Sequence, residues 1–181
     1  RKDGTEFWNR VSIAPVRTPD GEITNYVGFQ QDVTAEKDRE LRLERSERRY
    51  RAIFNDPNIL VGLLDTDGTV LEVNETAMAY VDATHDEVTG QPFWATPWFD
   101  HSEAVQQAVR GWIDRAADGE YVEFEADLLR PDGEPYTVEG VFRPVTNDEG
   151  EVVSLLVSDR DITERRERER ELQRYESYLE E

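Results

Sequence analysis

Hydrophobic and polar residues alternate along three stretches in the second half of the chain, residues 122–128, 136–142 and 153–157. A period of two is typical of a strand that is buried on one face. The turn sequences RPDGEP and NDEG separate the stretches, so the pattern predicts three consecutive antiparallel strands. The inward positions are expected to be Val122, Phe124, Ala126, Leu128, Tyr136, Val138, Gly140, Phe142, Val153, Leu155 and Val157.

The preceding region predicts two further strands and then helices. Residues 59–74 are typical of two strands joined by a turn, in which Gly68 can adopt a positive φ. Asn74 is placed to cap a helix over ETAMAY. Residues 102–117 carry an apolar stripe at helical spacing, and this helix is expected to stop near Gly119. The predicted order is therefore two strands, several helices and three strands.

The chain also repeats itself without gaps at an offset of 129 residues, so that residues 1–40 align with residues 130–169. The identical pairs include Asp3 and Asp132, Gly4 and Gly133, Pro15 and Pro144, Gly21 and Gly150, Asp32 and Asp161, and Thr34 and Thr163. Because the end of one module occurs twice, residues 5–33 are predicted to form a hairpin. A lone hairpin is marginal in water, so we expect its apolar face to pack on a neighbour or on the complete domain.

Composition excludes several classes of protein. The 181 residues include 21 basic and 41 acidic side chains, and a net charge of −20 would repel nucleic acid. No run approaches the roughly 18 to 20 apolar residues that cross a bilayer, and no signal peptide is recognisable. We therefore expect a cytoplasmic piece without membrane contact. The lack of cysteine excludes disulfides, thiolate metal sites and a cysteine nucleophile, and the start at Arg1 suggests a fragment of a longer protein.

Nineteen of the 21 basic residues are arginine. This lysine-poor, acidic composition resembles that of proteins from extreme halophiles, and an ordinary acidic domain is the alternative. We expect the melting temperature to rise from low salt to molar KCl, because screening relieves repulsion among carboxylates. Thermal melts at the two salt concentrations test this, and an unchanged or lower melting temperature in KCl would contradict the halophile interpretation.

Three segments together resemble a PAS sensor domain: GTVLEVNETAMAYVDATHDEVTGQPFW, the final three predicted strands, and DRDIT before a charged helix. The resemblance implies an α+β fold, with a five-stranded antiparallel sheet carrying helices on one face and flanked by charged, coiled-coil-like helices. It implies a complete PAS domain at residues 47–163 and the C-terminal strands of an upstream PAS domain at 1–34. Residues 35–50 would be a helical connector, and residues 164–181 the start of an output helix. One departure is at residues 81–83, where many members of the family carry a glycine.

In the first copy, FWN and GFQQD resemble the last strands of flavin-binding light-oxygen-voltage (LOV) domains, a PAS subgroup. By that resemblance Asn9 and Gln30 would face a flavin ring, whose polar edge offers partners to buried amides. The alternative is that both amides satisfy only backbone groups or water. A flavin site would exist only in the intact upstream domain, because its earlier strands and the segment with the reactive cysteine lie outside this sequence.

In the second copy the same two positions are Val138 and Asp159, which cannot reproduce the amide pair. No cofactor is therefore expected in the complete domain, and a small ligand of unknown identity remains open. The predicted pocket residues are Trp94, Trp98, Phe124, Val138, Phe142 and Asp159. The cluster of Trp94, Trp98, Phe99 and His101 fits core or lid packing, an organic ligand or haem, although His85 and His101 do not fall where PAS haem proteins usually place an axial ligand.

No catalytic or metal-ligating residue is predicted. The sequence has no G-x-S-x-G, no glycine-rich phosphate loop and no ligand cluster of His, Asp and Glu, while Asp65 and Asp67 flank a solvated turn. The resemblance instead implies a sensory module of a multi-domain signal-transduction protein, which receives a signal in its core and relays it through helical connectors. A PAS domain that acts only as a ligand-free dimerisation module is the alternative.

The charged connector segments, residues 35–50 and 164–181, are predicted to be helices with sparse apolar positions. These positions fall at heptad spacing, which favours a homodimer through the PAS domain and its connectors. The apolar heptad positions are Leu172, Tyr175 and Leu179, with Leu43, Tyr50 and Ile53 in the first copy. A solvated single helix is the alternative interpretation.

Signal relay is assigned to Asp161, Ile162 and Thr163, which resemble the DIT junction between a PAS core and its connector. Asp161 is expected to cap the terminal helix, with Glu164 completing a capping box, and to reach a basic neighbour such as Arg160 or Arg165. Ile162 would anchor the base of the helix in the core. The alternative is that Asp161 is only a cap and transmits nothing.

Overall fold

The computed structural model describes residues 2–179, with the side chains up to Tyr175, and divides the chain into two compact units. The first unit ends at Ala52 and the second begins at Ile53. The predicted heptad position at Leu179 therefore lies outside the side chains described.

The first unit begins with the predicted hairpin. Strands β1 (Asn9–Arg17) and β2 (Ile23–Asp32) pair antiparallel, and α1 (Thr34–Phe54) follows directly. Every residue of both strands is exposed, including Ile13 at 66% of its surface. The expected packing of this apolar face on a neighbour or on the complete domain therefore stays a prediction.

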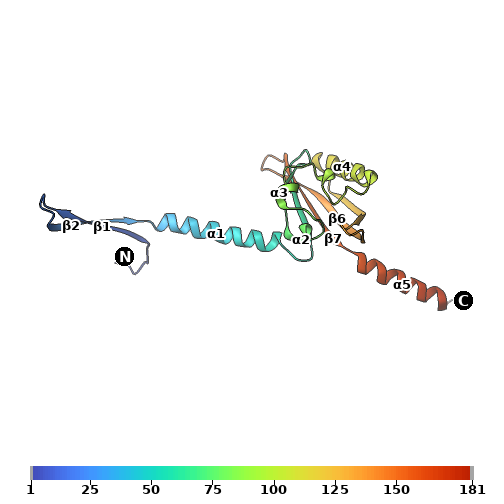
Figure 1. Ribbon diagram of the computed structural model, residues 1–181, viewed down its shortest axis with the longest axis horizontal. Coiled ribbons are helices and arrows are strands. Elements are labelled where there is room, and N and C mark those ends of the chain that lie inside the picture. The colour runs from blue at the N-terminus through green and yellow to red at the C-terminus, as the bar shows by residue number, and fades with distance from the viewer. Residues whose placement is uncertain (1, 180–181) are drawn as a thin grey trace. The chain divides into compact units, whose positions relative to one another are not determined.

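The second unit is built on a five-stranded antiparallel sheet, as predicted (Figure 1). Its strands lie in the order β4-β3-β7-β6-β5. Their bounds are β3 Leu60–Leu64, β4 Val70–Val73, β5 Val122–Leu129, β6 Pro135–Thr146 and β7 Val152–Asp161. Because β7 lies between β3 and β6, the last strand of the domain is central in the sheet, and a helix that follows it starts from the middle of the fold.

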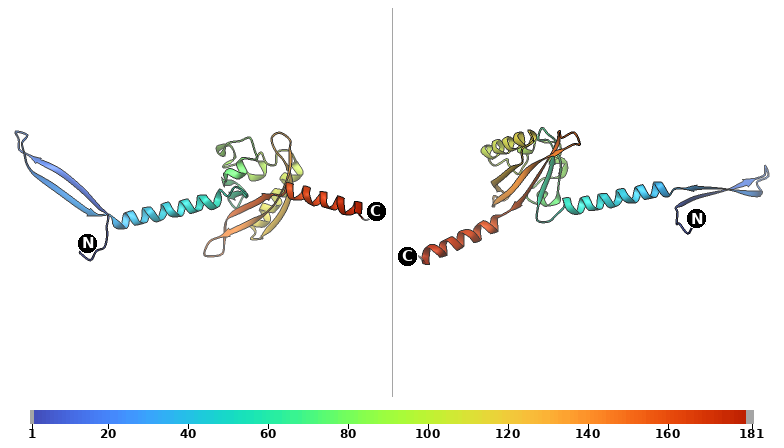
Figure 2. Two further views of the ribbon diagram at one scale, coloured as in Figure 1. Left: turned by 90° about the horizontal axis from the view of Figure 1, so that it is seen from below. Right: turned by 180° about the vertical axis from the view of Figure 1, so that it is seen from behind.

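Short helices and one long helix cover one face of this sheet, as the green and yellow segments of Figures 1 and 2 show. They are α2 (Glu75–Met78), α3 (His85–Val88), the 3-10 turn η1 (Phe93–Ala95) and α4 (Glu103–Ala117). Ser102 caps α4 by accepting a hydrogen bond from the Val105 amide, and Gly119 ends it with φ +94°. A final helix, α5 (Thr163–Leu179), begins two residues after β7, and its Leu172 and Tyr175 are exposed.

Asn74 joins the start of the second unit to its first strands and helix. Its side-chain oxygen accepts from the amides of Val61 at 3.0 Å and Ala77 at 2.9 Å. Its amide nitrogen donates to the carbonyls of Phe54 at 2.7 Å and Ile59 at 2.8 Å. The buried amide is thus fully paired, and it does more than cap α2, which was its predicted role.

The predicted alternation is wrong at the start of β7. Val153 is 48% exposed, while Val152 packs against the core instead. The pairing of β6 with β7 shifts register between Val145 and Thr146. A shift of one residue exchanges the two faces of a strand, so the bulge turns Val152 inward.

Candidate functional site

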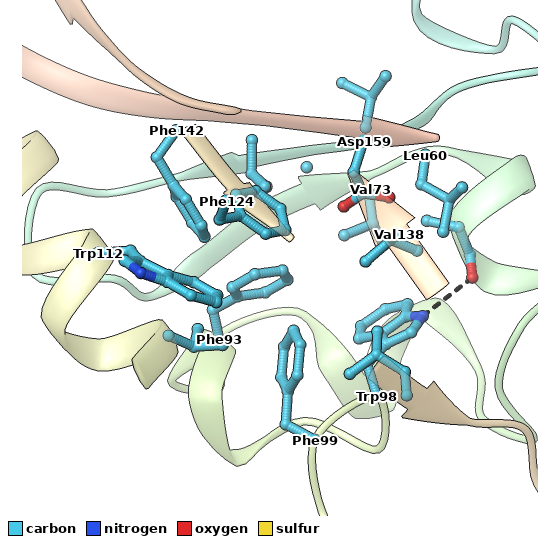
Figure 3. Close-up of a pocket in the computed structure, with 16 residues that line it drawn as sticks. Leu60, Val73, Phe93, Trp98, Phe99, Trp112, Phe124, Val138, Phe142 and Asp159 are labelled. Atoms are coloured by element: carbon cyan, nitrogen blue, oxygen red, sulfur yellow. Dashed lines mark hydrogen bonds between the residues drawn. The ribbon is translucent and has the colours of Figure 1, made fainter. Parts of the chain in front are cut away.

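A small cavity lies between the sheet and its covering helices (Figure 3). Its volume is about 30 Å³. Residues that line it are Leu60, Val61, Gly62, Val73, Ala77, Phe93, Trp98, Phe99, Val109, Trp112, Phe124, Leu128, Val138, Phe142, Val157 and Asp159. A cavity of this size has room for about two water molecules, so the closed pocket cannot hold a flavin or a haem.

Aromatic rings form much of the cavity wall and pack on one another. The rings of Trp112 and Phe124 stack with centroids 4.9 Å apart, and those of Phe93 and Phe99 meet edge to face at 5.0 Å. Trp98 is held by its Nε1, which donates to the Ala77 carbonyl at 3.1 Å. These contacts fix the rings in place, so a larger guest would have to displace them.

Five of the six residues predicted for the pocket line this cavity together: Trp98, Phe124, Val138, Phe142 and Asp159. Trp94 does not, and this part of the prediction is corrected by the structure. Its ring lies against Gly68 on one side and 5.1 Å from the Arg110 guanidinium on another. Phe93 of η1 lines the cavity, whereas Trp94 is half-buried and packs against the core outside the cavity lining.

The prediction of the pocket missed Phe93 and Trp112. Trp112 lies on the apolar stripe of α4, so its core-facing position was visible in the sequence but not its place at the cavity. His101 is exposed, and His85 lies 4.0 Å from a carboxylate oxygen of Glu75. Neither histidine lines the cavity.

Asp159 is the one side chain among the cavity-lining residues that ionises. Its Oδ1 is buried and has no hydrogen-bond partner in the structure. Burial, with a smaller contribution from the nearby charge of Asp161, raises the pKa of Asp159 to about 7. A carboxyl group with this pKa exists in both protonation states near neutral pH.

Gly140 makes the position of Asp159 feasible. The two residues are partners across β6 and β7. A Cβ atom on Gly140 would lie 2.5 Å from the Ser158 carbonyl oxygen and 2.7 Å from the Cα of Asp159, and closer still to its Cβ. Only glycine leaves room for β7 to approach β6 this closely.

The junction between β7 and α5 is tied to two strands. The amide of Thr163 donates to Asp161 Oδ1 at 2.9 Å, and its hydroxyl donates to the same atom at 2.5 Å. That hydroxyl also accepts from the amide of Thr137 on β6 at 3.0 Å. The amide of Ile162 donates to the Thr137 carbonyl at 2.8 Å, and the Ile162 side chain is buried. The base of α5 therefore follows the ends of both β6 and β7.

The second carboxylate oxygen of Asp161 faces an aromatic and basic cluster. It accepts from the Tyr80 hydroxyl at 3.0 Å and lies 3.6 Å from Arg130 Nη2. The Arg130 guanidinium lies over the rings of Tyr80 and Tyr136, at 4.1 and 5.4 Å from their centroids. Burial raises the pKa of both tyrosines, and the buried hydroxyl of Tyr136 has no hydrogen-bond partner in the structure.

Two details of the expected junction differ in the structure. The basic partner of Asp161 is Arg130, whereas Arg165 pairs with Glu139 at 3.1 Å. Glu164 lies 3.5 Å from Arg168 and completes no capping box among the described hydrogen bonds. Asp161 is the last residue of β7, so its carboxylate bonds to the residue two positions on instead of one turn into α5.

The same junction occurs in the first unit. The amide of Thr34 donates to Asp32 Oδ1 at 3.0 Å, and the Thr34 hydroxyl accepts from the amide of Trp8 at 3.0 Å. The amide of Val33 donates to the Trp8 carbonyl at 2.9 Å. Each of these residues is 129 positions before its counterpart in the second unit, which is Thr137 on β6 for Trp8 and Asp161, Ile162 and Thr163 for the others.

An ion pair recurs at both junctions with its charges exchanged. Arg10 lies 3.4 Å from Glu36 in the first unit, and at the equivalent positions Glu139 lies 3.1 Å from Arg165 in the second. Both pairs are exposed and contribute little stability.

The two residues predicted to face a flavin share one face of the hairpin. Gln30 lies opposite Val11, and Asn9 lies opposite Asp32 two positions along. Both amide side chains are exposed in this chain. The structure therefore shows their common face without showing a pocket around them.

Residues 2–179 contain no group of three or more His, Cys, Asp or Glu side chains that could hold a metal ion. Within the same part of the chain, no helix has the length and apolar character that crossing a membrane would require.

Comparison with protein families gives two matches. A family model described as "PAS fold" matches residues 54–167, and one described as "PAS domain" matches residues 1–35. The solved structure of the PAS domain of an HTR-like protein from Haloarcula marismortui is similar, with 28% identity and a TM-score of 0.53. The similarity covers 70% of this chain and 99% of that one.

Two curated relatives are larger proteins. Sensor histidine kinase TmoS of Ectopseudomonas mendocina is 32% identical over 127 residues, which is 69% of this chain and 13% of the kinase. A blue-light photoreceptor of Listeria monocytogenes is 50% identical over 46 residues, which is 25% of this chain and 18% of the photoreceptor. The chain thus corresponds to a small part of each relative.

Proposed function

The chain belongs to the PAS fold family, and from this we propose that residues 47–163 are a sensory module that receives a signal in the core and relays it through α5. The observation that carries the proposal is the placement of two carboxylates on one strand. Asp159 lines the cavity, and Asp161, two residues later on the same face of β7, holds the base of α5. The similarity to part of a sensor histidine kinase supports a sensory role.

The relay proposed here acts through relative movement of β7 and β6. A change in the cavity that shifts β7 would move the Asp161 carboxylate, to which Thr163 is bonded. The Thr163 hydroxyl is also bonded to Thr137 on β6, so a shift between the two strands changes the direction in which α5 leaves the domain. Asp161, Ile162 and Thr163 are the relay residues in this proposal.

We expect two copies of the chain to pair through the PAS domain and the connector helices. The outer face of the sheet carries the half-buried apolar residues Leu63, Val141 and Leu156, and α5 exposes Leu172 and Tyr175. Exposed apolar positions on consecutive elements are suited to a dimer interface. In such a dimer, a movement of α5 would change its position relative to α5 of the second copy.

We also propose that residues 1–34 are the last strands of an upstream PAS domain and that Asn9 and Gln30 would contact flavin in the intact domain. Their counterparts in the repeat are Val138 and Asp159, which both line the cavity of the complete domain. The match of a PAS model to residues 1–35 and the local identity with a blue-light photoreceptor support this.

A ligand-free dimerisation module is the second candidate, and the small volume of the closed cavity favours it. Extraction of small molecules from the purified chain, followed by mass spectrometry, separates the two candidates. A stoichiometric molecule released on denaturation supports a sensory pocket, and none in repeated preparations supports the dimerisation module.

Replacing Asp161 with alanine is expected to uncouple the stimulus from the output of the full-length protein. The change removes the bonds to Thr163, Tyr80 and Arg130 and should cost about 1 to 2 kcal/mol of stability. Ile113→Val is the matched control, because it costs about 1 kcal/mol in the buried face of α4 without touching the junction.

Output is measured with and without stimulus in both variants. The relay predicts that Asp161→Ala loses the difference between the two states while Ile113→Val keeps it. If both variants lose output only in proportion to their stability, the junction is a cap and the relay is wrong.

A further inference from the structure

We propose that the core cavity binds a primary organic amine in its ammonium form, with Asp159 as the residue that selects the charge. The inference deepens the sensory function proposed above and rests on it, because the amine would be the signal. It is carried by the geometry of one buried carboxyl group in an otherwise apolar, aromatic cavity.

One carboxylate oxygen in the cavity lacks a hydrogen-bond donor. Asp159 Oδ1 is buried from solvent and has no partner in the structure, whereas the buried amide of Asn74 is bonded at both of its polar atoms. A buried acceptor without a donor is costly, so a guest that brings a donor to Oδ1 gains more than a guest without one. Figure 3 shows the carboxylate beside Val73 and Val138, which offer no donor of their own.

Asp159 supplies the one ionisable side chain in the lining of the cavity. No other residue that lines the cavity ionises, so an anionic guest would meet only repulsion from Asp159. A cation would pair with the carboxylate and could also contact the faces of nearby rings, as ammonium groups do in aromatic sites. The lining therefore favours a cation over a neutral molecule of the same size, and a neutral molecule over an anion.

The volume of the cavity limits the size of the guest. A volume of about 30 Å³ accepts about two heavy atoms, which is the size of methylammonium. A longer amine would place its ammonium group at Asp159 and displace the rings of Phe99 or Phe124 from their present contacts. By displacing these rings, a larger signal molecule would move the elements that pack around β7.

Binding of a cation is expected to depend on pH. The raised pKa of Asp159, about 7, means that the carboxyl group must lose its proton before it can pair with an ammonium ion. The ionisable groups around it are Asp161 on its own strand and Tyr136 on β6, while β3 presents the apolar Leu60. Beyond them, Arg130 is engaged with Asp161. Affinity should therefore rise with pH through about 7, and binding below that pH should release a proton from Asp159.

Methylammonium chloride is the probe, and methanol is its neutral counterpart with the same number of heavy atoms. Backbone amide NMR spectra of the chain are recorded during titration at constant ionic strength, with KCl as the balancing salt. Constant ionic strength is needed because the net charge of −20 makes the chain sensitive to salt. A guest of two heavy atoms can bind with millimolar affinity at best, so NMR suits the measurement.

We expect saturable shifts at the amides of β7 with methylammonium and weaker or no shifts with methanol. Affinity should be about tenfold higher at pH 8 than at pH 6, because a group with a pKa of about 7 is about tenfold more ionised at the higher pH. Asp159→Asn should abolish the methylammonium shifts. Asp148→Asn, which removes one charge from an exposed turn, should retain them.

Three results would overturn the proposal: equal binding by Asp159→Asn, equal binding of methanol, or affinity that does not change with pH. Failure here is separable from failure of the relay, because this titration reports binding to the core and the Asp161→Ala experiment reports output. If methylammonium binds but Asp161→Ala keeps its response to the stimulus, the amine site is supported and the relay is wrong. If Asp161→Ala loses the response but methylammonium does not bind, the sensory role is supported with a signal other than an amine.

Discussion

Replacing Gly140 with alanine is expected to destabilise the second unit by about 3 kcal/mol. The new methyl group would lie 2.5 Å from the Ser158 carbonyl oxygen and 2.7 Å from Asp159 Cα, so backbone atoms must move to admit it. These atoms belong to β7, which is paired with β3 on one side and β6 on the other. No flexible side chain can move aside to relieve the clash.

Gly111→Ala is the matched control. Gly111 lies on the exposed side of α4, and a Cβ there has no atom within 4 Å. Alanine is the better helix former, so this variant should gain up to about 1 kcal/mol. Urea denaturation of both variants measures the two changes. Equal effects of the two substitutions, or a loss below about 1 kcal/mol for Gly140→Ala, would show that β6 and β7 are less tightly apposed than the structure indicates.

Replacing Asp159 with asparagine is expected to stabilise the chain increasingly as pH rises from 5 to 8. The pKa of Asp159 is about 7 in the folded state, above the ordinary value of 3.8. Between these two values the folded state holds a proton that the unfolded state has released, so the free energy of unfolding falls as pH rises. The contribution of the Asp159 proton to the free energy of unfolding is complete below about pH 3.8 and is lost by about pH 7.

Each pH unit in that interval corresponds to about 1.4 kcal/mol. Between pH 5 and pH 8 the wild type should therefore lose about 3 kcal/mol that Asp159→Asn does not lose, since asparagine does not titrate. The other carboxylates titrate in both proteins, and the difference between variant and wild type removes their contribution.

Urea denaturation at pH 5, 6, 7 and 8 gives the difference in the free energy of unfolding directly. A difference that stays constant across this range would mean that Asp159 has an ordinary pKa and is accessible to water. Asp148→Asn, which removes one charge from an exposed turn, again provides the control.

Local sequence patterns were sufficient to predict most of the architecture. Alternation of period two identified the strands of the sheet, helical spacing identified α4, and Asn74 and Gly119 marked where helices begin and end. These features depend on neighbours a few residues apart, which the sequence displays directly. The repeat at 129 residues located the junction between the last strand and the terminal helix in both units.

Only the tertiary structure decided which residues meet at the cavity and what the protonation state of Asp159 is. The presence of Phe93 rather than Trp94 at the cavity depends on one 3-10 turn, and the exchange of Val152 for Val153 depends on a bulge within β7 itself. Arg130 became the partner of Asp161 because the β5–β6 turn brings it there from 31 positions earlier in the chain. The raised pKa of Asp159 follows mainly from burial, with a smaller contribution from the charge of Asp161, and burial is a property of packing that the pattern of neighbouring residues does not display.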